Sequence, residues 1–178
     1  ITTIYVTHDQ DEALSMSDII AVMKSGRIEQ TGSPWEIYFR PVNRFVADFV
    51  GTVNFLVGKI VRTEGKLLTI HYSGMELVVP AEADAAAGEV VTLVVRPECI
   101  RLAGPDEAVT GGAVLDGMIE NYSFLGRIIR YWVRVGRELF VIDDANVDLT
   151  GARTGAVKLC LDPHKLHILK DGGGHDAS

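Results

Sequence analysis

Ten short runs of β-branched and aromatic residues follow one another from residue 55 to residue 169, and they restrict the fold more than any other feature. Glycine, proline or polar turns separate them, and no stretch between them shows helical spacing of apolar residues. Closely spaced strands without intervening helices are typical of a small β-barrel or sandwich. We therefore predict an all-β domain over residues 51–170, with strands at residues 55–62, 67–72, 76–79, 90–95, 100–102, 114–121, 128–135, 138–142, 157–161 and 166–169.

The chain begins with an apolar run of a different kind. Residues 1–6, Ile-Thr-Thr-Ile-Tyr-Val, have the composition of a strand buried on both faces. Asp9, with Glu12 three residues later, gives the capping-box signal for a helix start. His8 therefore lies at the carboxyl end of a predicted strand and just before a helix, where open α/β sheets bind ligands.

Helix and hairpin signals alternate in the rest of the first fifty residues. Two β-type runs at residues 19–23 and 27–31 enclose a short loop that contains glycine, which indicates a hairpin. Helix starts are expected at Ser33, which is followed by proline and a capping-box glutamate, and at Asn43. We predict a mixed α/β segment over residues 1–50 ahead of the mainly β domain.

Composition narrows the possible functions. The chain has 178 residues and a formal net charge of −7, which argues against a nucleic-acid-binding surface over the whole molecule. No apolar run approaches the ~20 residues that span a bilayer, so direct membrane insertion is not expected. Cys99 and Cys160 are isolated within apolar stretches, which indicates reduced core thiols and a cytoplasmic protein. Residues 171–178 are predicted to form a disordered tail.

Four segments carry a family resemblance. They read Tyr-Val-Thr-His-Asp-Gln-Asp-Glu-Ala at residues 5–13, Ser-Asp-Ile-Ile-Ala-Val-Met at 17–23, Gly-Arg-Ile-Glu-Gln-Thr-Gly-Ser-Pro at 26–34 and Asn-Arg-Phe-Val-Ala-Asp-Phe-Val-Gly at 43–51. In this order they resemble the switch-histidine region of ABC-transporter ATPase subunits. The resemblance implies that His8 is catalytic and contacts the γ-phosphate of ATP across a dimer, a role that suits an imidazole donor. The alternative is a strand-end histidine that is hydrogen-bonded to backbone carbonyls.

Other motifs of that family are missing. Gly58-Lys59 and Gly65-Lys66 are not followed by serine or threonine, so no phosphate loop is present. The Leu-Ser-Gly-Gly-Gln signature is absent as well. By resemblance, the chain is therefore expected to be the C-terminal part of a longer subunit that opens in mid-strand, and not to hydrolyse ATP alone. ATP and Mg²⁺ are expected in the full-length subunit, and neither a cofactor nor a metal on this fragment.

One acidic pair resembles the magnesium-binding motif of these ATPases. Asp143 and Asp144 follow an apolar run, as do the magnesium-binding acids of such ATPases. They come after the histidine, however, whereas the family places that strand before it. We interpret them as an amphipathic strand that runs into a polar turn.

The predicted β domain resembles the transport-associated OB-type (TOBE) module of importer ATPases, in stretches at residues 94–100, 117–126 and 161–169. The resemblance implies an OB-type β-barrel that follows the C-terminal fragment of a P-loop ATPase core. It also implies a homodimer of ATP-binding subunits, transmembrane permease partners, and a cytoplasmic protein held peripherally at the inner face of the membrane. The short linker at residues 51–56 favours polyamine, ferric-iron or phosphonate-type importers over sugar importers.

Three alternating side chains in the β domain form a candidate binding face. Period-two spacing puts Arg130, Trp132 and Arg134 on one side of the predicted strand at 128–135. Cationic and aromatic side chains on an OB-type strand suit single-stranded nucleic acid or a small oxyanion. The alternative, favoured by the acidic total, is a solvated or subunit-facing side with Trp132 packed between arginine stems. A stand-alone binding module is thus the alternative function, and a purely structural dimerisation domain a third.

Two histidines near the end of the chain are candidate metal ligands. His164 and His167 lie three residues apart, and the segment after Pro163 looks extended, which would put them on opposite faces. No third ligand cluster accompanies them, so no metal site is predicted.

Overall fold

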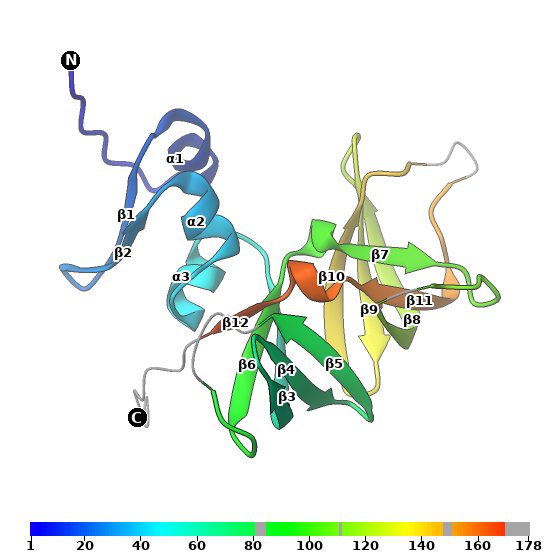
Figure 1. The fold of residues 1–178 in the computed structure, drawn as a ribbon. Helices are drawn as coiled ribbons and strands as arrows, with labels where there is room; N and C mark the ends of the chain where they lie inside the picture. The colour runs from blue at the N-terminus through cyan, green and yellow to red at the C-terminus, as the bar shows by residue number, and fades with distance from the viewer. Residues whose placement is uncertain (81–84, 111, 148–150, 170–178) are drawn as a thin grey trace. The chain divides into compact units, whose positions relative to one another are not determined.

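The chain divides into two compact units, the first comprising Ile1–Gly51 and Leu169 and the second Thr52–Ile168. Figure 1 shows the computed structural model, which describes residues 1–80, 85–110, 112–147 and 151–169. The tail predicted at residues 171–178 lies outside the described residues. None of the described helices is long and apolar enough to cross a bilayer.

The first unit combines three short helices with one hairpin. Its elements are α1 (Gln10–Met16), β1 (Ile20–Lys24), β2 (Arg27–Gly32), α2 (Pro34–Phe39) and α3 (Arg44–Phe49). The hairpin turn consists of Ser25 and Gly26, both with positive φ, between the paired residues Lys24 and Arg27. Two such residues match the twist of antiparallel strands, so the predicted hairpin is confirmed.

Polar caps start the two later helices where the sequence predicts them. The Glu36 amide donates to Ser33 Oγ at 3.3 Å, and the Ser33 amide donates to Glu36 Oε2 at 2.8 Å, which completes a capping box. Asn43 caps α3 by accepting a 2.9 Å hydrogen bond from the Val46 amide. The helices bury Ile37 and Val46 in a small core together with Val22 and Val50.

The predicted strand at residues 1–6 is not formed. The segment has no assigned secondary structure, and Ile4 and Val6 are each 90% exposed. Its composition favours a buried strand, but a strand needs hydrogen-bonding neighbours, and no described strand pairs with it. The apolar side chains are therefore left facing solvent.

The second unit is built from two five-stranded sheets, with strand orders β10-β9-β8-β11-β7 and β12-β6-β3-β4-β5 (Figure 1). Every strand-pair register that the structure gives is antiparallel, and all ten predicted strands are confirmed with small changes at their ends. They are β3 (Asn54–Glu64), β4 (Leu67–Tyr72), β5 (Met75–Pro80), β6 (Val90–Val95), β7 (Ile100–Ala103), β8 (Ala113–Phe124), β9 (Ile129–Val135), β10 (Glu138–Asp144), β11 (Gly155–Leu161) and β12 (His167–Leu169), with 3₁₀ turns η1 (Pro97–Cys99) and η2 (Pro163–Lys165).

Both sheets contribute to one hydrophobic core. Buried side chains of that core include Leu56 and Ile70 from one sheet and Tyr131, Phe140 and Leu159 from the other. Their strands alternate buried and more exposed positions, as in β9, where every second residue is buried. The expected mainly β, OB-type fold after a mixed α/β segment is therefore confirmed.

The segment after Asp162 differs from the prediction. Pro163–Lys165 form the 3₁₀ turn η2 and are not extended. Asp162 Oδ1 accepts a 3.0 Å hydrogen bond from the His164 amide, and Pro163 supplies a fixed φ at the first position of the turn. A local cap and a proline therefore outweigh the β-type composition that follows them.

Candidate functional site

His8 lies in a tightly bonded turn between residues 1–6 and α1. The Asp9 amide donates to Thr7 Oγ1 at 2.9 Å, and Asp9 Oδ1 accepts from the Glu12 amide at 3.1 Å, which caps α1. The Glu12 carboxylate accepts from Thr7 Oγ1 at 3.0 Å and from the Tyr5 hydroxyl at 3.1 Å. Asp9 thus caps the predicted helix, but the glutamate bonds backwards along the chain instead of closing a capping box.

The turn leaves the His8 imidazole free. His8 is exposed, and within the described part of the chain its side chain makes no hydrogen bond or ion pair. The neighbouring polar groups of Thr7 and Asp9 are engaged with one another or with Glu12. The Glu12 carboxylate also raises the pKa of the Tyr5 phenol by accepting its hydrogen bond. The arrangement holds the backbone at residue 8 and leaves the imidazole exposed to solvent.

The outer face of β9 is electrostatically satisfied. Arg130 forms a bidentate pair with Asp143, with both N–O distances 2.8 Å. Arg134 does the same with Glu120 at 2.8 and 3.0 Å, and this hydrogen bonding lowers the pKa of Glu120. Trp132 lies between them in sequence and is partly buried. The predicted face exists, but both cations are already neutralised by carboxylates, which weakens the case for nucleic acid or oxyanion binding there.

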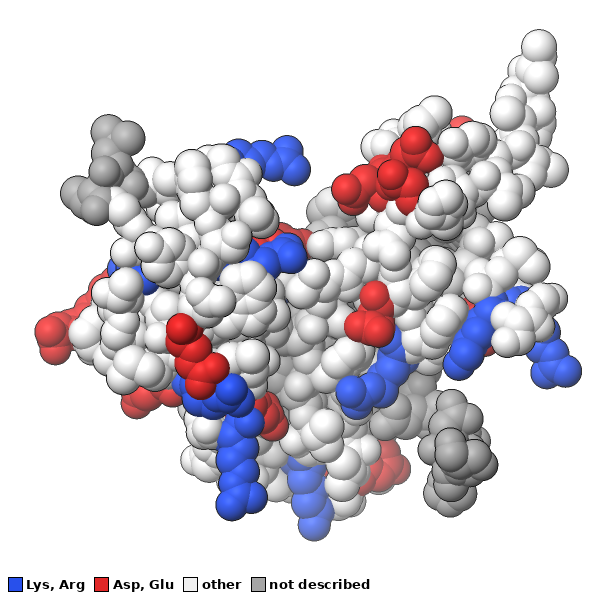
Figure 2. Space-filling view, turned by 180° about the vertical axis from the view of Figure 1, so that it is seen from behind, with Lys and Arg blue, Asp and Glu red and all other residues white. Residues whose placement is uncertain are grey.

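Charge is mixed over the surface as well. In Figure 2, Lys and Arg side chains lie among Asp and Glu side chains on the face shown, with uncharged residues between them. This face carries no continuous basic surface of the kind that tracks a nucleic-acid backbone, at least among the residues described.

The remaining candidates have structural explanations. Asp143 pairs with Arg130, as expected for a strand that ends in polar residues. His164 lies within η2 and His167 begins β12, and among the described residues no group of three or more potential ligands could hold a metal ion. Cys99 and Cys160 are partly buried free thiols, and desolvation raises the pKa of both.

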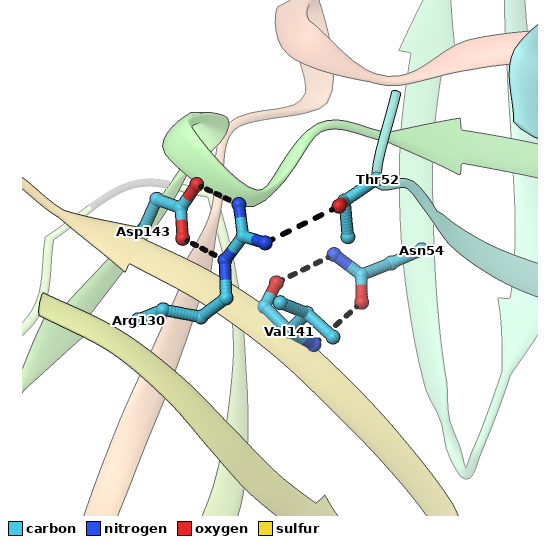
Figure 3. A network of polar contacts seen from close by, with 5 residues as sticks. All are labelled: Thr52, Asn54, Arg130, Val141 and Asp143. Carbon is cyan, nitrogen blue, oxygen red and sulfur yellow. Dashed lines mark hydrogen bonds and ion pairs between the residues drawn. The ribbon is translucent and has the colours of Figure 1, made fainter. Parts of the chain in front are cut away.

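A polar network that sequence reasoning missed surrounds the start of β3 (Figure 3). The Asn54 side chain donates to the Val141 carbonyl and accepts from the Val141 amide, both at 2.8 Å. Arg130 Nη1 donates to Thr52 Oγ1 at 3.4 Å, and the buried Arg96 donates to the Thr52 carbonyl at 3.2 Å. A buried asparagine at the head of an apolar strand was the available signal, but its partner lies 87 residues away in the sequence.

Comparison with known proteins gives consistent matches. Residues 93–169 match the TOBE domain family. The chain is 49% identical over 119 residues to the spermidine/putrescine import ATP-binding protein PotA of Ruegeria pomeroyi, covering 66% of this chain and 32% of that protein. It is 39% identical over 180 residues to PotA of Mesorhizobium japonicum, covering 96% of this chain and 47% of that protein. The chain thus spans about a third to a half of the length of these relatives.

A solved structure supports the fold. The cytoplasmic molybdate-binding protein ModG aligns with a TM-score of 0.55 and 14% identity, covering 65% of this chain and 94% of the other. At this identity the likeness concerns the OB-type fold alone.

Proposed function

Because this chain belongs with the ATP-binding subunits of ABC importers that carry a TOBE domain, we propose that it acts within such a subunit of a polyamine importer. Residues 1–50 are the C-terminal fragment of its nucleotide-binding domain, and residues 51–170 are its TOBE domain. The names of the relatives support spermidine or putrescine as the transported substrate. By family resemblance, the short linker before Asn54-Phe55-Leu56 favours polyamine, ferric-iron or phosphonate-type importers over sugar importers, which is consistent with this substrate class.

The role of His8 is supported by one observation, its exposed imidazole in a turn whose other polar groups are engaged. Phosphoryl transfer is catalysed mainly by positioned groups that stabilise charge on the phosphate. In the proposed mechanism the imidazole donates a hydrogen bond to the γ-phosphate of ATP bound across a subunit dimer. The fixed backbone of residues 7–9 limits the positions that this donor reaches. Mg²⁺ would neutralise phosphate charge when bound, and no described residue of this chain is assigned to hold it.

The partners follow from the same assignment. The subunit forms a homodimer and associates with transmembrane permease subunits at the cytoplasmic side of the membrane. The exposed apolar residues 1–6 and the exposed side chains of Trp35 and Phe49 are surfaces that further protein would cover. The TOBE domain contributes to dimerisation and regulation.

The test is the substitution His8→Ala in the ATP-binding subunit that contains this chain. We expect nucleotide affinity to change less than threefold and the rate of ATP hydrolysis to fall by roughly 10²-fold or more, because the lost hydrogen bond acts mainly on the transition state. Binding is measured with a fluorescent ATP analogue and turnover by phosphate release. His164→Ala is the matched control, since His164 is also exposed but lies in the β domain.

Two results would contradict the proposal. Unchanged hydrolysis in His8→Ala would remove His8 from the mechanism. An equal loss in His164→Ala would show that the assay reports a general effect of removing an exposed histidine.

A further inference from the structure

The first residues of the second unit, Thr52–Asn54, are held by side chains that come from distant parts of the β domain (Figure 3). We propose that residues 52–54 form a strap that closes onto β10 and opens from it as one unit, without unfolding the β domain. The state of the strap then decides whether the residues after Gly51 belong to the rigid β domain or to a free linker.

One end of the strap is fixed by Asn54. Its carboxamide donates to the Val141 carbonyl and accepts from the Val141 amide at 2.8 Å each, and it also lies 3.4 Å from the Val95 carbonyl. A pair of opposed N–H···O bonds to one residue is the pattern that a neighbouring strand makes. Asn54 is only 6% exposed, so the closed strap shields these hydrogen bonds from water.

The other end is fixed by two arginines. Arg130, which is anchored by Asp143, donates to the Thr52 hydroxyl, and Arg96 donates to the Thr52 carbonyl. The Arg130–Asp143 pair is partly buried, with side-chain exposures of 29% and 12%. Hydrogen bonds to charged groups in such surroundings contribute more than bonds between neutral groups.

The two ends are coupled by their spacing. Thr52 and Asn54 are two residues apart in the strap. Asn54 bonds directly to Val141 on β10, whereas Thr52 accepts from Arg130, whose own partner Asp143 lies two residues after Val141 on β10. The strap is only three residues long, so its two ends are joined by few rotatable backbone bonds. Release of one end is therefore expected to disturb the hydrogen bonds of the other end. This spacing predicts opening of the strap as a unit.

The strap lies where it opens at low cost. β10 is the last strand of its sheet, and Phe140 and Ile142 point into the core while Val141 faces the strap through its backbone. The contacts described here that hold the strap are hydrogen bonds, and local openings that break a few such bonds occur well below the free energy of global unfolding. The inference does not depend on the proposed function, because every contact that carries it lies within Thr52–Ile168.

The experiment is amide hydrogen exchange, resolved by NMR, on the 178-residue chain and its Arg130→Met variant. Methionine keeps most of the aliphatic stem but removes the bonds to Thr52 and Asp143. We expect the Val141 amide, which Arg130 does not contact, to exchange on the order of tenfold faster. The Ile142 amide, whose side chain is buried in the core, reports global unfolding and is expected to keep its rate.

Arg134→Met is the matched control. Arg134 lies on the same face of β9 and also forms a bidentate pair with Glu120, but its hydrogen bonds go to Glu120 and the Arg137 carbonyl and not to residues 52–54. Asn54→Ala removes the partner of Val141 directly, and adding Arg130→Met to it is expected to speed Val141 exchange no further, because the strap is already open.

Three results would overturn the proposal. Unchanged Val141 exchange in Arg130→Met would mean that the two ends act separately. Equal acceleration in Arg134→Met would indicate a general loosening of the sheet. Equal acceleration of Ile142 would show that the domain unfolds and that no local strap opens.

Discussion

The two units use their apolar residues in contrasting ways. In the β domain, side chains from two sheets form one large core, whereas the first unit buries only a small cluster around Ile37 and Val46. Large apolar residues at the start of the chain are instead exposed, among them Ile4 and Val6. The comparison teaches that apolar composition alone does not produce burial. A β-type run becomes a buried strand only where a neighbour supplies its hydrogen bonds.

The substitution with the largest expected effect tests whether the core of the β domain stabilises that domain independently of the first unit. Phe140→Ala removes an aromatic ring that is 2% exposed and should lower the free energy of unfolding by about 3–5 kcal/mol. The chain has two tryptophans, so Trp132 fluorescence in a Trp35→Phe background reports the β domain during urea denaturation. Val46→Ala, in the core of the first unit, is expected to leave that transition in place. A shift of equal size would mean that the units do not unfold separately.

A substitution with a smaller expected effect tests how closely β8 packs against its neighbours β9 and β11 in the same sheet. A Cβ atom at Gly117 would lie 2.7 Å from Val133 Cγ1 and 2.8 Å from Leu159 Cδ1, too close without movement of both side chains. Gly117→Ala should therefore destabilise the β domain by about 1–3 kcal/mol in the same urea measurement. Gly104→Ala is the control, because a Cβ there meets nothing within 4 Å. Equal stability of the two variants would contradict the close packing at Gly117.

The exposed apolar start of the chain provides the next test. We expect the 19.4 kDa chain to form a dimer in solution, and the double substitution Ile4→Asp, Val6→Asp to weaken association about tenfold or more by placing charge on that surface. Light scattering at micromolar concentration measures this. Val57→Asp, at an exposed valine of β3, is the control. A purely monomeric wild-type chain would refute the expectation.

The smallest effect concerns the capping box of α2. Hydrogen bonds from the Ser33 amide and hydroxyl lower the pKa of the Glu36 carboxyl. The resulting stabilisation is complete above the ordinary glutamate pKa of about 4.3 and is lost as the pH falls through the lower folded value. Carboxyl NMR should show Glu36 titrating below that pKa. The protection factor of the Ser33 amide, which corrects for the pH dependence of intrinsic exchange, should fall in acid. In Glu36→Gln the Ser33 exchange should lose this acid step, and its persistence would assign the step to another group.

Local signals predicted the fold well where the interactions are local. The turn at Ser25-Gly26 and the caps at Ser33 and Asn43 lie within a few residues of their partners, and all were recognised from the sequence. The period-two alternation in β9 placed its inner and outer faces correctly. The family predicted from the motifs is confirmed by the relatives.

Non-local pairing explains what was missed. The carboxylates that neutralise Arg130 and Arg134 are set by the register of β9 with β10 and β8, and register was not predicted. The contact of Asn54 with Val141 depends on how the two sheets meet, which no local pattern encodes. The strand predicted at residues 1–6 is not formed for a related reason. The composition of the segment is that of a strand, but a strand also needs a second segment to pair with, and no described strand pairs with it.

The carboxamide of Asn54 has a consequence for solubility. Edge strands expose a row of donors and acceptors that invite pairing with other chains, and proteins usually block them with charges, prolines or bulges. Here the Asn54 side chain bonds to the outward-facing amide and carbonyl of Val141, in the middle of β10, and so interrupts that row. A single primary amide therefore protects this sheet margin against aggregation, and chains that lack it should precipitate sooner on mild heating.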